Sequence, residues 1–560
     1  VAADAAIYLE LPRPAPLIER AMGPQVQAAL RVVPQLGRYF QGEQYGTLRR
    51  VADLVADRLG TTAEDALRGL TAGGMTFAIE GEAGVPPRSF LIVTPDDPEL
   101  ARKASDALLA LARQDAANQG KDDPVKSAEY RGIAGYAVGK AAYALVDGSL
   151  VISDKSETLK TVIDPARDGV KGGGGAIADD AAWKARRARV EPETLAWGLV
   201  RLDRLRELDP RRFKVPEKLS PPQTFLFGSW LDALRNADRI EARLTWSDRR
   251  LGVDVTLPVP SGGSREVLKG FIPAAGSGAP ALVSPPGMIA GASLWRDLAA
   301  IWEARSELFT PEVQQDLAKL DTFAGQFFGG RDFGSGVLGA LDPRWRLVVA
   351  HQDYKSLSPA PDVKLPGFAL IADLNPDDED FNQRLKVAFQ SFVGLANLGA
   401  AQKSAPPLEL GSEVCEGVTI STSHYMVPRA DAEEKGPVHQ RFNFTPSIAQ
   451  VDNHFILSSS LGLTRALIRT LKTPAASSDV TLLAEADGPA LARLVTLNRD
   501  RLILQNMLDK GHGQAEAETE IGRLERLLKF LGRGRLTVRD GPETLRFDLG
   551  FTLSDSDPNP

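Results

Sequence analysis

The sequence predicts an α+β fold in two tandem homologous domains, each a largely antiparallel sheet with helices packed on it. Three observations lead to this prediction. The chain of 560 residues is longer than one hydrophobic core usually supports. It contains the same hairpin-and-helix pattern twice. Its strand-like segments also follow one another in hairpins instead of alternating strictly with helices.

The clearest repeat is the pair of segments Ala142–Ile163 and Ser447–Ile468, which align without a gap from Ala144 and Ala449 onward. Each copy has the pattern of a strand, a tight turn, a second strand and a helix. Asp147-Gly148 is a strong signal for a two-residue hairpin turn, and Asp452-Asn453 tolerates the same left-handed backbone. Identical pairs in the two copies include Val146/Val451, Asp147/Asp452, Ser153/Ser458 and Ile163/Ile468.

The first repeat begins with a short strand at Ala5–Leu11. Residues 48–59 follow with apolar side chains at helical spacing, and residues 76–80 and 89–94 have the pattern of strands. A long helix comes next, with Asp97 as its predicted N-cap and a proline at its first helical position.

This long helix has a counterpart in the second half of the chain, because Pro95-Asp96-Asp97 matches Pro376-Asp377-Asp378. Both halves also close on a pair of strands, in which Arg243-Leu244-Thr245 matches Arg535-Leu536-Thr537. A segment rich in Gly, Ser and Pro lies between the halves, as expected for a linker. We therefore predict a first repeat at residues 1–260, a linker at 261–280 and a second repeat at 281–560.

The two repeats differ in two segments. Residues 426–441 are polar and charged, which is typical of an inserted surface loop. The first repeat instead carries the run Gly172–Gly175 and a short helical segment, Asp180–Arg189, which the second repeat lacks. Because the shared segments account for the fold, we expect function where the repeats differ or at the seam between them.

The composition is that of an ordinary globular protein, with 43% hydrophobic and 25% charged residues. The net charge of −7 argues against broad binding to nucleic acid or an anionic membrane. No apolar run reaches the roughly 18 residues that a membrane helix needs. The single cysteine, Cys415, excludes an internal disulfide framework and a Cys-rich metal site. The start at Val1, followed by small residues, fits removal of a secretory signal and predicts a periplasmic or extracellular protein.

No catalytic, cofactor-binding or metal-binding residue is predicted. The sequence has no GxSxG, P-loop or GxGxxG motif, and Gly172–Gly175 lacks both the leading strand and the lysine of a P-loop. The histidines all lie in the second repeat, none has the spacing of a metal-binding motif, and surface or turn positions are the simpler interpretation for each. They are His351, His424, His439, His454 and His512.

Three other polar groups also have a structural interpretation. The acidic segment Asn375–Asp380 has oxygen ligands suited to Ca²⁺, but the matching segment in the first repeat starts a helix. The paired residues Asp147/Asp452 and Ser153/Ser458 have structural roles instead of forming a duplicated active site. The turn needs the aspartate, and Ser153 or Asp154 with Glu157 suits a helix capping box. The basic run Trp183–Arg189 has no interleaved stacking aromatic residues and is interpreted as a solvated helix face.

The duplicated arrangement resembles uncharacterised exported bacterial proteins that are grouped as a domain of unknown function. The resemblance rests on Ala5–Leu11, on Ala144–Ile163 with its repeat, and on the segment from Gly330 to Val349. It implies an exported α+β protein without an assigned activity, and it carries over no functional residue.

These observations favour a non-enzymatic exported protein, a binding module or structural component of the bacterial envelope that contacts a protein partner or a second copy of itself. One alternative is a carrier of an apolar ligand such as lipid, with a groove lined by Phe381, Phe389 and Phe392. The other is a hydrolase that uses carboxylates and a histidine of the second repeat. A histidine within hydrogen-bond reach of an Asp, Glu or Ser in a cleft would favour the hydrolase.

Overall fold

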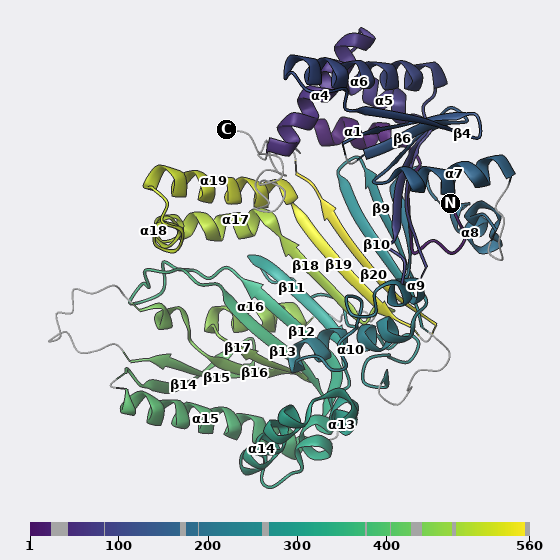
Figure 1. The fold of residues 1–560 in the computed structure, drawn as a ribbon. Coiled ribbons are helices and arrows are strands. Elements are labelled where there is room, and N and C mark those ends of the chain that lie inside the picture. Colours follow the sequence, from purple (N-terminus) through teal and green to yellow (C-terminus); the bar gives the residue numbers. More distant parts are fainter. Residues whose placement is uncertain are drawn as a thin grey trace. The chain divides into compact units, whose positions relative to one another are not determined.

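The chain folds into two compact units in a computed structural model (Figure 1). Unit 1 comprises Val1–Val215 and Ala237–Pro258, and unit 2 comprises Pro216–Asn236 and Val259–Ser556. Each unit has a large antiparallel sheet with helices on it, so the predicted α+β class is confirmed. The structure describes residues 1–23, 43–82, 84–139, 141–168, 175–188, 190–259, 268–375, 378–403, 405–426, 439–472, 478–541 and 543–554.

The strands of unit 1 are β1 (Ile7–Leu11), β2 (Met75–Glu80), β3 (Arg88–Val93), β4 (Val125–Tyr130), β5 (Ile133–Val138), β6 (Ala141–Val146), β7 (Ser149–Ser153), β8 (Thr194–Arg201), β9 (Arg239–Ser247) and β10 (Arg250–Pro258). Their order across the sheet is β10–β9–β8–β1–β2–β3–β7–β6–β5–β4, and every pair of neighbours is antiparallel.

Helices cover the sheet of unit 1 through small apolar clusters. Leu159 and Ile163 of α7 pack on Ala144 and Val151 of the repeated hairpin, and Val55 of α4 belongs to a separate cluster with α6. The helices of this unit are α1 (Pro14–Met22), α4 (Glu43–Leu59), α5 (Ala63–Thr71), α6 (Pro98–Asn118), α7 (Ser156–Asp168), α8 (Ala181–Arg187) and α9 (Leu202–Leu208).

The strands of unit 2 are β11 (Met288–Trp295), β12 (Leu341–Ala350), β13 (Gly367–Leu374), β14 (Leu408–Cys415), β15 (Val418–Tyr425), β16 (Ser447–Val451), β17 (His454–Ser458), β18 (Leu482–Asp487), β19 (Arg533–Asp540) and β20 (Thr544–Thr552). Their order is β20–β19–β18–β11–β12–β13–β17–β16–β15–β14, again with antiparallel neighbours throughout. Strand for strand, this is the order of unit 1.

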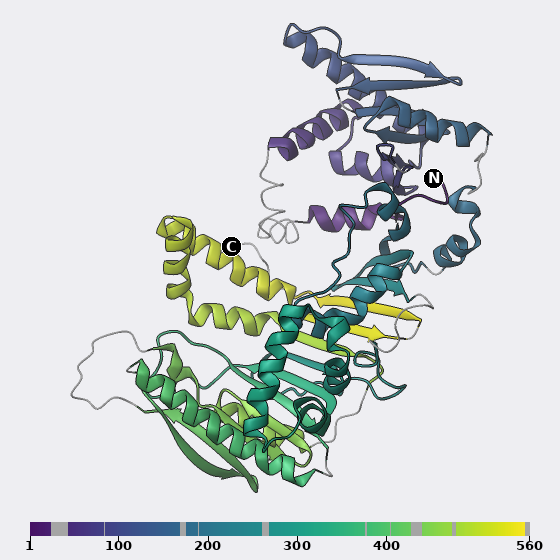
Figure 2. The ribbon, with the colours of Figure 1, turned by 60° about the horizontal axis from the view of Figure 1, so that its bottom comes forward.

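Two helices of unit 2 pack on opposite faces of its sheet. Leu467 and Ile468 of α16 are fully buried on the face that carries Ile371 and Ile456, whereas α15 packs on Ile448 from the other side (Figure 2). The helices of this unit are α10 (Pro221–Asn236), α12 (Leu298–Glu303), α13 (Arg305–Leu308), α14 (Pro311–Phe327), α15 (Glu379–Gln402), α16 (Leu461–Leu471), α17 (Gly488–Leu497), α18 (Arg499–Lys510) and α19 (Gln514–Leu531).

The repeated turns also share their backbone geometry. Asp147 and Asp452 have φ values of 48° and 51°, and Arg131 and Glu416, in the preceding hairpins, both have φ of 53°. Arg131 pairs with Asp168 of α7 at 2.5 Å, whereas Glu416 pairs with Lys472, which follows α16, at 3.2 Å, so the charges of this turn-to-helix contact are reversed. An internal duplication remains a prediction, and a shared strand order and shared turn geometry are expected from such an origin.

The predicted capping box at the repeated serines is wrong. Ser153 is the last residue of β7, and its hydroxyl donates to the carbonyl oxygen of Ser89 in β3 at 3.0 Å. Ser458 makes the equivalent contact with the carbonyl oxygen of Phe368 at 3.5 Å. Both serine hydroxyls also accept a backbone N–H two residues later, but α7 starts only at Ser156 and α16 at Leu461. The serines therefore hold the turn before each helix and tie the hairpin to its neighbouring strand without forming a capping box.

The segment Pro216–Asn236 lies in the first half of the chain but packs within unit 2. Its helix α10 is kinked at Phe227, which has φ of −129° and ψ of 17°. The kink leaves the carbonyl oxygens of Phe225 and Leu226 open, and the guanidinium of Arg296 donates to them at 2.8 and 3.0 Å. Arg296 is fully buried and lies 3.7 Å from the buried carboxylate of Asp540, which also accepts from Ser229 of α10.

Part of the predicted linker at residues 261–280 is packed instead of extended. Phe271 is fully buried in a cluster with Ile301 and Phe309, and Ala279 is buried against Val480, so both belong to the core of unit 2. Residues 261–267 of that linker, 172–174 of the glycine run, 376–377 of the acidic segment and 427–438 of the inserted loop lie outside the described residues.

None of the described helices combines the length and the apolar character needed to cross a membrane.

Candidate functional site

The most distinctive surface of unit 2 is the face of its sheet opposite α16, here called the open face. Alternate residues of its central strands point to this face, and strand register aligns them in two rows across the sheet. The first row is Leu549, Leu536, Ala484, Ala292, Leu347, Leu370 and Leu457, from β20 to β17. The second row is Phe551, Gly534, Ala486, Ala290, Val349 and Phe368.

The middle of both rows is a hollow of about 330 Å³. Its depth comes from residue size, because both central positions of β11 and β18 are alanine and the second-row position of β19 is glycine, while larger side chains stand on both sides. The walls beside the hollow are unusually accessible for large apolar groups: Leu347 is 43% exposed and Phe368 is 50% exposed. The small central residues are Ala290, Ala292, Ala484, Ala486 and Gly534.

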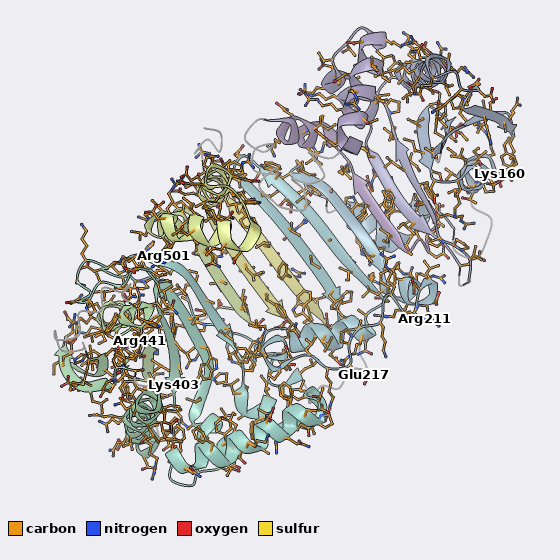
Figure 3. All side chains as sticks on the ribbon, turned by 60° about the vertical axis from the view of Figure 1, so that its left-hand side comes forward. Lys160, Arg211, Glu217, Lys403, Arg441 and Arg501 are labelled. Atoms are coloured by element: carbon orange, nitrogen blue, oxygen red, sulfur yellow. The ribbon has the colours of Figure 1, made fainter. Side chains whose placement is uncertain are left out.

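Two helices limit the open face without covering the hollow. Phe225 and Trp230 of α10 pack on Leu294 and Trp345, at one end of the central strands. On the β16 side, Phe389 and Val393 of α15 pack with Ile448. Figure 3 draws the side chains on this unit, with Lys403 labelled directly after α15. The apolar strip between these helices is therefore bounded by protein and open at its centre.

Unit 1 places larger side chains on the strand equivalent to β11, although its neighbouring positions Gly198 and Ala242 are smaller than their counterparts in unit 2. Its first row is Val255, Ala242, Gly198, Leu9, Phe77, Leu91 and Ile152, in the same strand order. Leu9 takes the position of Ala292, and its Cδ2 lies 2.3 Å from where a Cβ on Gly198 would stand. In the second row, Ile7, Val200 and Ile240 replace Ala290, Ala486 and Gly534. The hollow is thus a difference between two units with the same strand order.

The three phenylalanines expected to line a groove have different surroundings. Phe381 is 1% exposed and Phe389 is 9% exposed, so both are core residues. Phe392 is 55% exposed, and its ring stacks on Phe327 of α14 at 5.3 Å. The residues that do form the hollow were missed, although Ala290-Gly291-Ala292 inside a strand pattern was a visible signal, because strands usually carry larger side chains.

A buried ionic cluster lies on the α16 face of the same sheet. Asp373, which is 1% exposed, accepts from Arg346 at 2.7 Å and pairs with Nδ1 of His454 at 2.6 Å. Burial alone would raise the pKa of Asp373, but the His454 hydrogen bond and the charge of Arg346 outweigh it and lower that pKa. In unit 1 the same two strand positions carry Thr94 and Ser149, whose hydroxyls lie 3.3 Å apart.

The cluster places a histidine beside a carboxylate, as a hydrolase would require, but it lacks the rest of such a site. Within the described part of the chain, no Ser, Thr or Cys side chain is hydrogen-bonded to His454, which is 20% exposed on its side chain. His454 directly follows the Asp452-Asn453 turn, so of the surface or turn position expected for it the turn is the one observed. The geometry is that of a buried ion pair, in which Nε of Arg346 has no hydrogen-bond partner among the described residues, and not that of a nucleophile with its base.

The other histidines lie apart from this cluster and from one another. His351 pairs with the carbonyl oxygen of Ala490 at 2.9 Å, and His439 accepts from the backbone of Arg441 at 3.1 Å. His424 lies 3.4 Å from Glu409, and His512 lies 3.0 Å from the side chain of Asn506. The described residues contain no group of three His, Cys, Asp or Glu side chains arranged to hold a metal ion.

Ion pairs account for the described part of the acidic segment considered for calcium. Both Asp378 oxygens accept from Arg331, at 2.6 and 3.0 Å, and Asp378 also accepts from the backbone N–H of Phe381 as the N-cap of α15. Asp380 accepts from Arg331 at 2.9 Å and from Arg384 at 2.7 Å. The hydrogen bonds from Arg331 lower the pKa of Asp378, which keeps it anionic in this network.

Comparison with known proteins found no matching family model and no matching curated protein. Among solved structures, crystal form I of TP0453 aligns with 46% of this chain and 76% of its own, at 10% identity and a TM-score of 0.24. Crystal forms IV and III of TP0453 align at 12% and 11% identity, cover 45% and 47% of this chain and 76% and 79% of their own, and both have TM-scores of 0.22. Scores this low support no conclusion about fold or function, and the resemblance to an exported family stays a prediction.

Proposed function

We propose that this chain is a binding protein without catalysis of its own, and that unit 2 takes up an alkyl chain, such as that of a lipid, on its open face. The observation that carries the proposal is the hollow of about 330 Å³ made by small residues inside an otherwise bulky apolar surface. Its volume lies at the lower end of the roughly 300–1,000 Å³ that small-molecule sites span. Unit 1, with Ile7 and Leu9 in the equivalent positions, supplies an internal contrast.

The chemistry of the open face favours a ligand without polar groups. The backbone groups of β11, β12, β18 and β19 already pair within the sheet. A peptide laid across them would bury its own N–H and C=O groups without partners, which costs a few kcal/mol for each group. An alkyl chain has no such groups and gains free energy from every methylene that it removes from water, about 0.8 kcal/mol each.

The dimensions of the apolar strip also suit an alkyl chain. The first row crosses seven strands, from Leu549 to Leu457. Six intervals of about 4.8 Å between strands give a strip about 29 Å long. The strip is deepest at its central alanines, and the equivalent positions of unit 1 are filled by Ile7 and Leu9.

Titration with a fluorescent long-chain fatty acid tests this proposal. Filling the hollow by Ala292→Leu or Ala484→Leu is expected to weaken binding at least tenfold, because each leucine occupies space that the ligand needs. Ala128→Leu, at an exposed strand position of unit 1, is the matched control and is expected to bind like the parent protein.

Native mass spectrometry after gentle purification provides an independent check. We expect a bound lipid-sized mass that is lost in Ala292→Leu and retained in Ala128→Leu. The proposal fails if no lipid co-purifies and the parent protein binds the fluorescent acid no better than Ala292→Leu does.

A second candidate function is contact with a protein partner or a second copy of the chain. It is favoured by α18, where Leu504 is 52% exposed and Leu508 is 80% exposed beside a hollow of about 620 Å³. Light scattering tests self-association, which predicts a larger mass for the parent protein than for Leu508→Glu. A monomer mass for both proteins would exclude self-association. A periplasmic or extracellular location is a further part of the proposal, tested by fractionation of the native host.

A further inference from the structure

Unit 1 has a hollow of its own, of about 410 Å³, beside α8. It lies in the segment in which the two repeats differ, and on a different part of the fold from the equivalent of the open face. Its polar and aromatic lining comes from β1, β8, α8 and the residues that follow β1. These residues are Glu10, Arg13, Trp183, Lys184, Arg187 and Trp197.

An aromatic cluster forms the inner side of this hollow. The ring of Tyr8 lies 6.0 Å from that of Trp183 and 5.5 Å from that of Trp197, and the two indoles are 6.0 Å apart. Both tryptophans are more than nine-tenths buried, and their indole N–H groups have no hydrogen-bond partner in the described chain. Three rings at such distances hold one another in place and give a rigid apolar surface.

The single carboxylate of the hollow is already fully paired. Oε2 of Glu10 accepts from the Tyr8 hydroxyl at 2.7 Å, and Oε1 accepts from Nε and Nη2 of Arg187 at 3.1 and 2.9 Å. Burial, followed by the hydrogen bond to Glu10, raises the pKa of Tyr8, so this hydroxyl stays protonated and keeps donating. Glu10 therefore leaves little attraction for a cationic ligand.

The remaining charge in the hollow is positive. The guanidinium of Arg187 lies 5.3 Å from the ring centre of Trp183, and its Nη1 has no hydrogen-bond partner within the described residues. Lys184, one helical turn earlier and exposed, has no hydrogen-bond or ion-pair partner in the same part of the chain. Arg13 donates a 3.3 Å bond to the carbonyl oxygen of Glu191, its one hydrogen bond to the described residues. Three cations thus stand against one paired carboxylate.

Unit 2 does not share these residues. Glu10 lies opposite Thr76 and Trp197, and the equivalent residue of β11, Ser293, lies opposite Arg346 and Leu483. The position of Tyr8 is taken by Gly291. The aromatic and basic hollow is therefore particular to unit 1, and the common fold alone does not require it.

We propose that this hollow binds a small organic anion, a carboxylate or a phosphate monoester, attached to a planar apolar group. The planar group packs against Trp183 and Trp197, which offer a rigid apolar surface. The anion is held by Lys184 and by the outward N–H groups of Arg187 and Arg13, which match carboxylate and phosphate oxygens in geometry and charge.

Calorimetric titration with three probes of equal ring size tests the proposal: phenyl phosphate, phenylacetate and 2-phenylethylamine. We expect both anions to bind, with affinity that falls as salt is added, and the amine not to bind. Phenyl phosphate and phenylacetate together distinguish the two anion classes. Tryptophan fluorescence should change on binding in the parent protein and change less in Trp183→Phe.

The matched variants are Lys184→Ala and Lys126→Ala, both at exposed positions of unit 1, with circular dichroism as the check on folding. Lys184→Ala is expected to weaken anion binding at least fivefold and Lys126→Ala to leave it unchanged, with Arg13→Ala as a second variant that weakens it. The proposal is overturned if the amine binds as well as the anions, if neither anion binds at millimolar concentration, or if the two lysine variants bind alike.

Discussion

At the scale of single residues, the most constrained charge of unit 2 is the Asp373 carboxylate. It is 1% exposed and bonded to both Arg346 and His454, so removing its charge leaves a buried arginine without its partner. We expect Asp373→Asn to lower the free energy of unfolding of unit 2 by about 3 kcal/mol at pH 7, in the range for broken buried pairs. Urea unfolding of the full chain measures this loss.

The pH dependence of that loss follows from the direction of the pKa shift. The folded pKa of Asp373 is below its usual value, and an unfolded Asp has a pKa of about 3.9. The stabilisation is therefore fully present above about pH 5 and is lost as the pH falls through the unfolded and then the folded pKa. Asp373→Asn should approach the stability of the parent as the medium becomes acidic.

A matched control for this prediction is Asp452→Asn, the same chemical change in the adjacent turn. Its backbone is left-handed, a conformation that asparagine accepts, so we expect a change within about 0.5 kcal/mol at every pH. If Asp373→Asn behaves like Asp452→Asn, the cluster does not stabilise the protein.

The partner of His454 was beyond sequence reasoning for a physical reason. Asp373 is remote in sequence and meets His454 only through the register of β13 against β17. The local sequence pattern predicted the hairpin of β16 and β17. That pattern contains no information about which strand pairs with the other edge of β17. The hollow could not be predicted for the same reason. Small residues in β11 make a hollow only because the neighbouring strands β18 and β19 also carry small residues.

At the scale of elements, α10 shows most clearly how a distant segment is held in unit 2. Its open carbonyl groups accept from Arg296, and its Ser229 donates to Asp540. Burial raises the pKa of Asp540, although the charge of Arg296, the largest opposing effect, and hydrogen bonds to the carboxyl group act to lower it. We expect Arg296→Met to cost about 3–5 kcal/mol, since it leaves the buried Asp540 without its neighbouring positive charge and two carbonyl groups without their donor.

Hydrogen exchange measured by peptide is the suitable readout for Arg296→Met. Loss of protection should concentrate in Pro221–Asn236 and the strand ends that it covers, while α16 stays protected. Arg533→Met, at an exposed arginine of β19, is the control and should change little. Equal exchange in parent and Arg296→Met would contradict this role of Arg296.

Local sequence signals predicted helix starts better than helix positions. Asp97 caps α6 through the N–H of Glu99, as the sequence indicated, and Asp378 caps α15. Neither signal reaches beyond one turn of helix. The packing of α10 in unit 2 depends on Arg296, and nothing in the sequence around Arg296 marks it as the partner of a distant helix. The prediction from chain order therefore assigned α10 to the first repeat.

At the scale of the whole molecule, the two units have the same strand order but are not separated by a single cut in the chain. Pro216–Asn236 precedes the linker in sequence and belongs to unit 2. A protease site engineered into residues 261–263 would therefore yield two fragments that each contribute to unit 2. We expect these fragments to elute together in size-exclusion chromatography and to part only in denaturant.

The complementary result would contradict this account of unit 2. Fragments that separate in native buffer would show that α10 does not hold the N-terminal part of the chain. The Arg296→Met variant, cleaved at the same site, tests the contribution of Arg296. Its fragments should separate at a lower urea concentration than those of the parent.

Two sheets with one strand order carry two different hollows, one apolar and deep in unit 2 and one aromatic and basic in unit 1. The repeats in the sequence predicted that the halves share a plan, because turn and core residues recur in order. They could not show the apolar hollow, which arises where the two units differ in side-chain size at matched strand positions, whereas the aromatic hollow lies beside α8, in a segment where the repeats differ. We therefore expect the functions of this chain at the positions where the side chains of the two units differ.

The most direct test of the apolar site is labelling with a photoreactive long-chain fatty acid, followed by peptide mapping. The account predicts crosslinks in β11, β18 and β19, the strands that carry the small residues of the hollow, and their loss in Ala292→Leu but not in Ala128→Leu. Crosslinks that concentrate on α18 or in unit 1, or that persist unchanged in Ala292→Leu, would contradict it.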